Sequence, residues 1–366
     1  MEQKTILFGI LNWGLGHASR SIPIIRDLLN NSGFNIILAA DGDAYNLLSA
    51  EFPAVPIQQI KDIRIRYRNG KWLPFGLLWA GIKLIKINRK EQKQVSNLVK
   101  QHHVDIVISD NRYGFWSYYS KNIIITHQLT LLPPKRFAFM EFLFRRIIKH
   151  RLAPFSEVWV PDLKDEPGIA GVLSHQPKAH TKIRYIGLLS RYYKEPFRCD
   201  SLIPLMAIVS GPMPFRKQLA EKLIQVAETN SNPLVLYTND LSLNYQGKFV
   251  DVRQNVSFHE LNSALNRAEM VIGSAGYTTI MDLILLNKKA ILIPTPGQTE
   301  QAYLSKINRN KQTIDFLKFH ELDLLFDRIA QLKIEVKEEN LQSNNNQKIT
   351  SFTDFMKEGL NFPENI

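Results

Sequence analysis

The chain has 366 residues, of which 45% are hydrophobic and 22% are charged, and its formal net charge is +12. This length and apolar content are ordinary for a globular protein and predict two α/β domains. The single cysteine, Cys199, excludes an internal disulfide framework and is expected to be a bystander rather than a nucleophile. We expect a cytoplasmic protein, because the sequence shows neither a secretory signal nor an apolar stretch of about 20 residues.

In the first half of the chain, predicted strands alternate with predicted helices. Strands are expected at residues 5–11, 34–40, 104–109, 122–126, 157–160 and 183–186, and helices at 20–31 and 43–50. The continuous apolar runs are typical of strands that are buried on both faces of a parallel sheet. The alternation predicts a doubly wound, Rossmann-like domain over residues 1–190.

The second half repeats this pattern and predicts another Rossmann-like domain over residues 201–345. Strands are expected at 205–209, 234–237, 249–252, 270–272 and 290–293, and helices at 215–227, 261–267 and 278–286. The polar segment 187–201 is expected to link the domains, and the tail 346–366 to form a helix that packs back on the first domain. The predicted fold class is therefore α/β, with two doubly wound parallel sheets facing across a cleft.

A loop with two glycines follows the first predicted strand and opens a helix. Gly14 and Gly16 allow a ligand to approach the backbone closely, and the N-terminus of a helix favours a bound anion. The same glycines with Ser19 half-match a dinucleotide fingerprint. We favour nicotinamide or flavin binding less, because it would leave the second glycine loop of the chain unexplained.

His17 lies in the same loop and is a candidate general base, because imidazole titrates near neutral pH. Asp110, at the end of the predicted strand 104–109, is expected to accept the other ring N–H and so to fix the tautomer, as in a catalytic triad. A structural or helix-capping His17 is the alternative. His127 follows the strand 122–126, and its position leaves an acceptor-pocket role and a structural role open.

The second glycine-bearing loop, 273–279, joins the strand 270–272 to the next predicted helix. Asp282, further along that helix, is placed to accept hydrogen bonds from a vicinal diol such as ribose. An ordinary helix start, with Asp282 favouring the helix dipole, is the alternative. The candidates for anion binding in this loop are Ser274, Ala275, Gly276, Thr278 and Thr279.

Two further segments of the second half carry candidate binding residues. Ser210 and Gly211 precede the helix 215–227, and Arg216 in its first turn is expected to clamp an anion. Glu300 and Gln301 follow the strand 290–293, and their side chains suit sugar hydroxyls. A rigid loop before an ordinary helix is the alternative for this last segment.

Basic residues concentrate in two segments, 61–100 and 135–151, where they are interleaved with aromatic and aliphatic residues. Such interleaving is what a helix on an anionic membrane surface needs. Core-packed helices with solvated basic edges are the alternative. Nucleic acid is not an expected partner, because no recognisable nucleic-acid-binding motif is present.

Both loops resemble those of glycosyltransferases of the GT-B fold, around the peptidoglycan N-acetylglucosaminyltransferase and the UDP-glycosyltransferases. The first match is Gly14-Leu15-Gly16-His17, with Arg20 beyond it. The second spans 274–282, continues through 287–294 and ends at Glu300-Gln301. The chain departs from the pattern at Asp282, where Glu is usual, at Ala275, where Gly is common, and at Asn287, where Gly is usual.

The resemblance implies a division of labour between the two loops. The residues around Gly276 would face the diphosphate of a nucleotide donor, Asp282 the ribose, and Glu300 and Gln301 the donor sugar. His17 would be the base on the acceptor hydroxyl. Gly14 and Gly16 from the first loop, with Ser210, Gly211 and Arg216, complete the expected donor-binding set.

The expected function is metal-independent, inverting sugar transfer from a nucleotide-diphosphate donor to an acceptor hydroxyl, with no metal and no cofactor. The resemblance favours a UDP-sugar, and a lipid-linked acceptor at the inner face of the membrane is one option. The triplet Asp41-Gly42-Asp43 has the letters of a metal motif, but it lies in the wrong half of the chain for the diphosphate. A sugar-nucleotide 2-epimerase and a non-catalytic membrane-surface protein are the alternatives.

Overall fold

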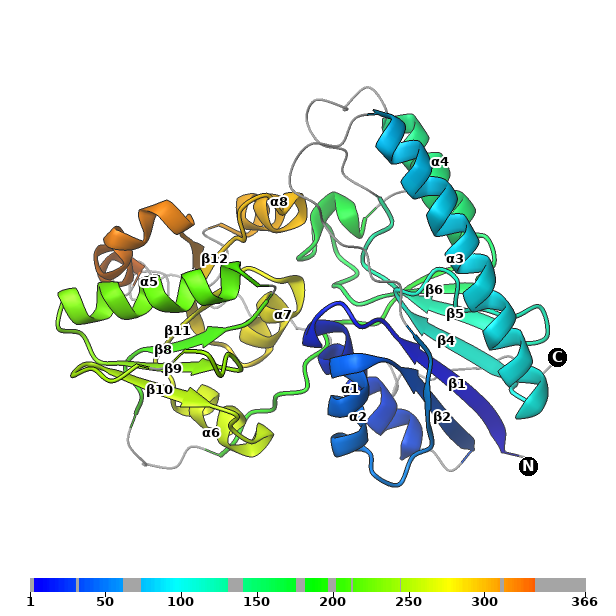
Figure 1. Ribbon diagram of the computed structural model, residues 1–366, viewed down its shortest axis with the longest axis horizontal. Helices are drawn as coiled ribbons and strands as arrows, with labels where there is room; N and C mark the ends of the chain where they lie inside the picture. The colour runs from blue at the N-terminus through cyan, green and yellow to red at the C-terminus, as the bar shows by residue number, and fades with distance from the viewer. Residues whose placement is uncertain are drawn as a thin grey trace. The chain divides into compact units, whose positions relative to one another are not determined.

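The computed structural model describes residues 3–30, 33–61, 74–130, 141–175, 182–196, 202–211, 213–243, 245–309 and 313–332. These residues form two compact units, which meet in the sequence between Leu189 and Ser190, with Ile169–Gly171 assigned to the second unit. Each unit has a central sheet covered by helices (Figure 1). Cys199 and the tail 346–366 lie outside the described residues, and the domain limits 1–190 and 201–345 stay predictions.

The first unit contains a seven-stranded sheet of order β3-β2-β1-β4-β5-β6-β7. Its strands are β1 (Lys4–Ile10), β2 (Phe34–Ala40), β3 (Ile57–Gln59), β4 (Ile106–Asp110), β5 (Lys121–Ile125), β6 (Glu157–Val160) and β7 (Ile183–Tyr185). Its helices are α1 (Leu15–Leu29), α2 (Gly42–Glu51), α3 (Pro74–Gln101) and α4 (Glu141–Leu152), with a short 3-10 turn, η2 (Gly171–Leu173). The strand order reverses between β1 and β4, so the carboxyl ends of these two strands form the topological switch point.

The second unit contains a six-stranded sheet of order β10-β9-β8-β11-β12-β13. Its strands are β8 (Met206–Val209), β9 (Leu234–Thr238), β10 (Val250–Gln254), β11 (Met270–Ser274), β12 (Lys289–Ile293) and β13 (Ile314–Phe316). Its helices are α5 (Phe215–Thr229), α6 (Phe258–Arg267), α7 (Tyr277–Leu285), α8 (Thr299–Asn308) and the 3-10 helix η3 (Phe319–Leu324). Here the order reverses between β8 and β11, which places the loops before α5 and α7 at the switch point.

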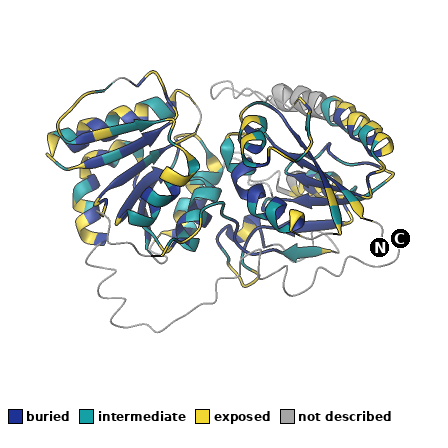
Figure 2. Ribbon diagram, turned by 90° about the horizontal axis from the view of Figure 1, so that it is seen from below, coloured by how far each residue is buried: buried dark blue, intermediate teal, exposed yellow. Residues whose placement is uncertain are grey.

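All strand pairings within both sheets are parallel, which confirms the predicted α/β class with two Rossmann-like sheets. The strands are buried along most of their length, while the outer helix faces are exposed (Figure 2). In the first unit, Leu7 and Val107 pack against Val95 and Val99 of α3. Burial on both faces explains why these strands read as continuous apolar runs.

Several element boundaries differ from the prediction, and some elements were not predicted. Helix α1 begins at Leu15, five residues before the predicted start at 20, so its first turn contains Gly16 and His17. Helix α6 begins at Phe258, before the predicted 261, because the Ser257 side chain caps it and accepts from the Glu260 N–H at 3.2 Å. The strands β3 and β13 have only three residues each, too few for a periodicity signal.

Candidate active site

The carboxylate of Asp110 is the centre of a polar cluster in the first unit. It lies at the carboxyl end of β4, beside Ile10 at the end of β1. Three side chains of α1 donate to it: His17 Nδ1 to Oδ1 at 3.0 Å, Arg20 through Nε to Oδ2 at 3.0 Å and also to Oδ1, and Ser21 Oγ to Oδ2 at 2.8 Å. Positions i, i+3 and i+4 lie on one face of a helix, so one carboxylate can meet all three.

The protonation states of this cluster follow from its burial and its charges. Burial alone would raise the pKa of Asp110, but the charges of Arg20 and His17 and their hydrogen bonds outweigh it and hold the pKa below its ordinary value. Asp110 is therefore a carboxylate at neutral pH. Burial and then the charge of Arg20 lower the pKa of His17, against the opposing effect of Asp110. His17 is therefore neutral at pH 7.

The hydrogen bond to Asp110 decides which nitrogen of His17 carries the proton. An ionised carboxylate only accepts, so the proton lies on Nδ1 and the lone pair on Nε2. No described residue forms a hydrogen bond with Nε2, and 15% of the side-chain surface is exposed. This arrangement leaves a basic nitrogen free to take a proton from a ligand.

The backbone before His17 is shaped by Gly14. Gly14 has φ 71° and ψ 178°, a region that is essentially confined to glycine. A β-carbon added at Gly14 would have no neighbour within 4 Å among the described residues. The glycine is thus required by the turn itself, and it leaves open space beside the first turn of α1.

In the second unit, the loops before α5 and α7 are joined at the switch point. Ser274 Oγ, at the end of β11, donates to the carbonyl oxygen of Ser210 at 3.1 Å. Gly211 has φ 109°, and a β-carbon there would also meet nothing within 4 Å. The structure thus brings together Ser210, Gly211 and Ser274, which the sequence analysis singled out separately, and Ala275 and Gly276 lead from Ser274 into α7.

Asp282 lies on α7 and is held by residues that precede the second sheet. Burial raises the pKa of Asp282 to about 7, and this shift is opposed by a hydrogen bond from Ser190 and by the charge of Arg191. Its Oδ1 atom is buried without a hydrogen-bond partner among the described residues. A buried carboxylate oxygen of this kind costs free energy until a ligand or a proton satisfies it.

Residues 190–196 pack against α6 through ring contacts and hydrogen bonds. These contacts explain why Ser190 and Arg191 lie beside Asp282. The ring of Tyr192 stacks on Phe258 at 5.7 Å, and the Arg191 guanidinium lies 5.2 Å from the same Phe258 ring. The backbone N–H of Tyr193 donates to Asn262 Oδ1 at 3.1 Å. Arg191 Nε is buried and has no hydrogen-bond partner among the described residues.

Arg216 and Asp240 are a second pair of charged residues at the carboxyl edge of this sheet. Arg216 lies in the first turn of α5, and Asp240 follows β9, whose Thr238 pairs with Val209 at the end of β8. Hydrogen bonds from Ser242 lower the pKa of Asp240, with smaller contributions from the charges of Arg216 and Lys217. Arg216 Nε has no hydrogen-bond partner among the described residues.

The remaining predicted residues lie around α8 and α7. Gln301 Oε1 accepts from the backbone N–H of Thr295 at 2.7 Å, so this side chain holds the loop before α8. Glu300 is half-buried at the start of α8, and Thr278 and Thr279 are half-buried in the first turn of α7. Within the described residues, no group of three or more His, Cys, Asp or Glu side chains is arranged to hold a metal ion.

Sequence reasoning missed several residues of both clusters. Arg20 was named only in the match to the glycosyltransferase pattern, without a role, and Ser21 was not named. Both follow His17 at helical spacing, so a helix start at Leu15 would have placed them on its face. Ser190 and Arg191 lie in the polar segment between the two halves, and the sequence carries no signal that links them to Asp282. Asp240 lies two residues after the end of β9, a position similar to the one that drew attention to Asp110.

Two family models match this chain. Residues 4–132 match the model described as glycosyl transferase family 1, and residues 216–358 match the glycosyltransferase family 28 C-terminal domain. A comparison with curated protein sequences gives no match.

Several solved structures share this fold over nearly the whole length of the chain. The MurG structure from Acinetobacter baumannii is 15% identical, with a TM-score of 0.55 over 92% of this chain and 94% of that one. The spinosyn forosaminyltransferase SpnP is 12% identical, with a TM-score of 0.65 over 97% and 98%. The calicheamicin glycosyltransferase CalG4 is 14% identical, with a TM-score of 0.63 over 92% of both chains.

The two parallel-sheet units and these structural neighbours define a protein of the GT-B fold. Because glycosyltransferase models match both halves of the chain, this GT-B protein is a glycosyltransferase, similar to MurG and to the UDP-glycosyltransferases. The resemblance stated from the two glycine loops is confirmed.

Proposed function

We propose that the protein is an inverting, metal-independent glycosyltransferase in which His17 is the general base. The observation that carries this proposal is the hydrogen bond of 3.0 Å between His17 Nδ1 and Asp110, which leaves the lone pair of Nε2 available beside an open glycine turn. Nε2 takes the proton of the acceptor hydroxyl. At the same time, the hydroxyl oxygen attacks the anomeric carbon of the donor sugar from the face opposite the diphosphate. The new C–O bond forms as the bond to the diphosphate oxygen breaks, and the nucleotide diphosphate leaves with both electrons.

The second unit supplies what the leaving group needs. The N-terminal turns of α5 and α7 offer backbone N–H groups and positive dipole ends to the diphosphate, and Arg216 and Arg191 offer charge. Asp282 accepts from the ribose hydroxyls, and Glu300 meets the donor sugar. Gln301 contributes to donor binding indirectly, because its contact with Thr295 holds the loop before α8. The proposal requires these groups and His17 to reach one donor–acceptor pair in the reacting complex.

Replacement of His17 tests the base assignment. We expect His17→Ala to lower kcat by about 10²–10⁴-fold, which is the usual contribution of a positioned base, and to leave the dissociation constant of UDP within about twofold. Initial rates with a UDP-sugar and calorimetry with UDP measure the two quantities. Asn12→Ala in the same loop is the control, because the Asn12 side chain lies just before the glycine turn and its Oδ1 accepts from the Ala44 N–H at 3.3 Å. Unchanged turnover in His17→Ala would discard the assignment.

The same assay separates the proposal from the epimerase alternative. Incubation with UDP-N-acetylglucosamine and no acceptor yields an epimer only if the protein is a sugar-nucleotide 2-epimerase. Thermal shift with UDP, dTDP, GDP and ADP identifies the base, since a ligand of the folded state raises the melting temperature. One of the structural neighbours, VinC, was solved with dTDP, so both pyrimidines belong in the panel. Full activity in EDTA is the expected result for metal independence.

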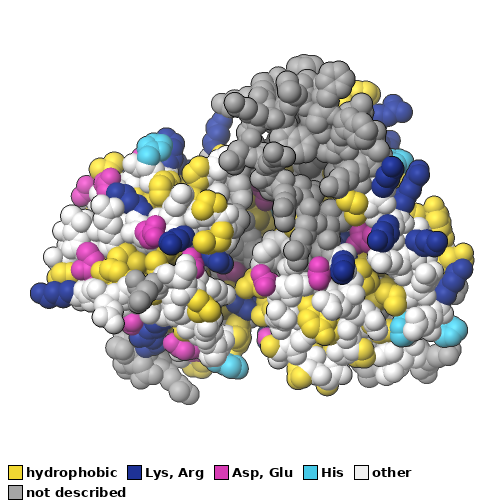
Figure 3. Space-filling view, viewed as in Figure 1, with side chains coloured by type: hydrophobic (Ala, Val, Ile, Leu, Met, Phe, Trp, Pro, Cys, Tyr) yellow, Lys and Arg dark blue, Asp and Glu magenta, His cyan; other side chains and the backbone are white. Residues whose placement is uncertain are grey.

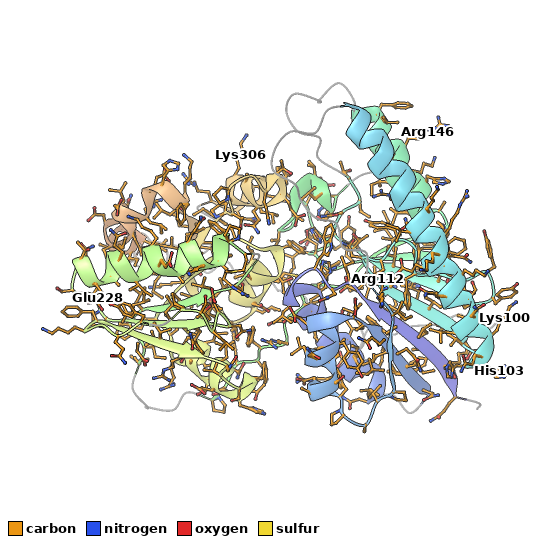
Figure 4. All side chains as sticks on the ribbon, viewed as in Figure 1. Lys100, His103, Arg112, Arg146, Glu228 and Lys306 are labelled. Carbon is orange, nitrogen blue, oxygen red and sulfur yellow. The ribbon has the colours of Figure 1, made fainter. Side chains whose placement is uncertain are left out.

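We further propose that the first unit rests on an anionic membrane surface and takes a lipid-linked acceptor. Lys86, Arg89, Lys90, Lys93 and Lys100 are exposed along α3, at spacings that keep them on one side of the helix. On α4, Phe142 and Leu143 are exposed beside Arg145 and Arg146. Figure 3 shows such basic side chains over this unit, and Figure 4 labels Arg146 on α4 and Lys100 near the carboxyl end of α3. No helix within the described ranges has the length and apolar character to cross a bilayer.

A further inference from the structure

Arg20 is a buried charged residue for which the reaction described above has no role. Its side chain is 2% exposed, and it grips both oxygens of Asp110, through Nε at 3.0 Å and through Nη2. Its Nη1 lies 3.5 Å from Nδ1 of His127, at the end of β5. A buried guanidinium is costly unless its partners offset the loss of hydration, so a residue of this kind in the centre of the cluster calls for an explanation.

The hydrogen bonds from Arg20 to Asp110 weaken the ability of this carboxylate to stabilise a protonated His17 ring. In a simple histidine–aspartate pair, the carboxylate stabilises the imidazolium strongly and makes the ring a strong base. Here Asp110 Oδ1 is shared between His17 and Arg20, and the guanidinium repels a proton on the ring. The charged or titratable groups that act on His17 are Arg20 on its own helix, Asp110 at the end of β4 and His127 after β5.

We propose that Arg20 is a positioning residue of the active site, which fixes the Asp110 carboxylate under α1 and keeps His17 neutral and ready to accept a proton over a wider range of acidity. This inference rests on the proposed role of His17 as base. The planar guanidinium matches both carboxylate oxygens at once, which an ammonium cannot do. Arg20 thereby prevents Asp110 from rotating when the proton arrives at Nε2.

The charge of Arg20 is tested by the titration of His17 itself. In the full-length protein, NMR of the histidine ring signals across pH measures the pKa of His17 without any turnover. We expect Arg20→Met to raise this pKa by about 1, because a positive neighbour is removed and Asp110 Oδ1 no longer shares its charge between the imidazole and a guanidinium. Ser21→Ala is the matched control, since it removes one neutral donor from the same carboxylate at 2.8 Å, and it should leave the pKa of His17 close to its wild-type value.

A conservative replacement tests whether the two-point hydrogen bonding of the Arg20 guanidinium to Asp110 is needed. Arg20→Lys keeps the charge and loses the two-point grip, so we expect the pKa of His17 to stay low while kcat falls about tenfold or more at an unchanged KM for the donor. Circular dichroism and melting temperature show whether each variant folds. If Arg20→Met does not fold, Arg20→Lys still decides the matter, because wild-type kcat in this variant would overturn the proposal.

The two proposals fail in different ways. Full turnover in His17→Ala would remove the base assignment, whereas the ring titration in Arg20→Met would still report whether Arg20 controls His17. An unchanged pKa of His17 in a folded Arg20→Met protein would overturn the role of Arg20 and leave the base assignment standing.

Discussion

At the scale of single residues, the first unit depends on one buried carboxylate that accepts from three side chains of one helix. Asp110 fixes the tautomer of His17, and Arg20 and Ser21 hold Asp110. Asp282 is the opposite case, because burial leaves one of its oxygens without a partner. The two aspartates therefore respond to pH with opposite signs.

Acid should weaken the first unit. The pKa of Asp110 is lower in the folded state, so its stabilisation is complete above the unfolded value near 4 and is lost as pH falls through the folded value. The pKa of His17 is also lowered, so the unfolded chain binds more protons below pH about 6.5 and stability falls again. We expect the melting temperature of Asp110→Asn to depend less on pH between 3 and 7 than that of the wild type. Equal pH dependence in the two proteins would contradict this account.

Replacement of Asp282 by Asn should raise the stability of the protein at alkaline pH and lower its affinity for UDP. The pKa of Asp282 is raised to about 7, so the folded state favours the protonated form, and stability is lost as pH rises from the unfolded value toward 7. We expect Asp282→Asn to melt at a higher temperature than wild type at pH 8 and at the same temperature at pH 3. Its affinity for UDP should fall about tenfold, which is the loss of roughly one hydrogen bond to a charged group. Unchanged UDP affinity would remove the ribose contact from the proposal.

At the scale of elements, the site residues are placed by helix starts at the carboxyl ends of parallel strands. Gly14 sets the entry into α1, and Gly276 sets the entry into α7 with an ordinary φ of −76°. Helix α3 is tied to the end of β1 by Arg112, which donates to Glu91 at 2.6 Å and to the carbonyl oxygen of Ile10 at 3.3 Å (Figure 4). The carboxyl end of β1 thus supports both the loop before α1, which we propose to carry the base, and the basic helix α3.

The two helix entries predict different responses to alanine. Gly14→Ala should cost about 1–3 kcal/mol of stability, because its backbone conformation is strained for any residue with a β-carbon, although no described atom obstructs the methyl group. Gly276→Ala is the matched control, since its backbone is ordinary and its nearest described contact, Thr279 Oγ1, lies at 3.5 Å. Scanning calorimetry measures both, and equal melting temperatures for the two variants would refute the strain argument.

At the scale of the whole molecule, part of the net charge of +12 is concentrated on the described residues of α3 and α4, with five exposed basic side chains on one side of α3. Electrostatic attraction to an anionic surface falls off within a Debye length of about 8 Å at physiological ionic strength. The membrane proposal therefore depends on salt and on lipid charge, and it can be separated from the sugar-transfer chemistry.

A vesicle flotation experiment tests whether the first unit binds an anionic membrane surface. We expect the wild type to float with vesicles that contain anionic lipid at low salt and to be released at about 0.5 M salt, where screening is strong. The variant in which Lys86, Arg89, Lys90 and Lys93 are replaced by Glu should remain in the soluble fraction and keep its turnover on a water-soluble acceptor. Replacement of the exposed Lys217 and Lys318 in the second unit by Glu, with half as many charge reversals, is a control for charge reversal on another surface. Flotation of the α3 variant with anionic vesicles would contradict the proposal.

The sequence by itself determined the class of fold, because strands buried on both faces of a parallel sheet require continuous apolar runs, and glycine-bearing loops after them mark helix entries. It also singled out Asp110, which lies directly after such a run, and His17, which lies in the glycine-bearing loop after another. Only the tertiary structure decided that Arg20 and Ser21 share Asp110 and that Ser190 and Arg191 flank Asp282. Those contacts join positions 89 and 90 residues apart in the first case and belong to an irregular segment in the second. Local periodicity carries no information about such pairs, because the packing of a helix on a sheet edge determines which side chains meet.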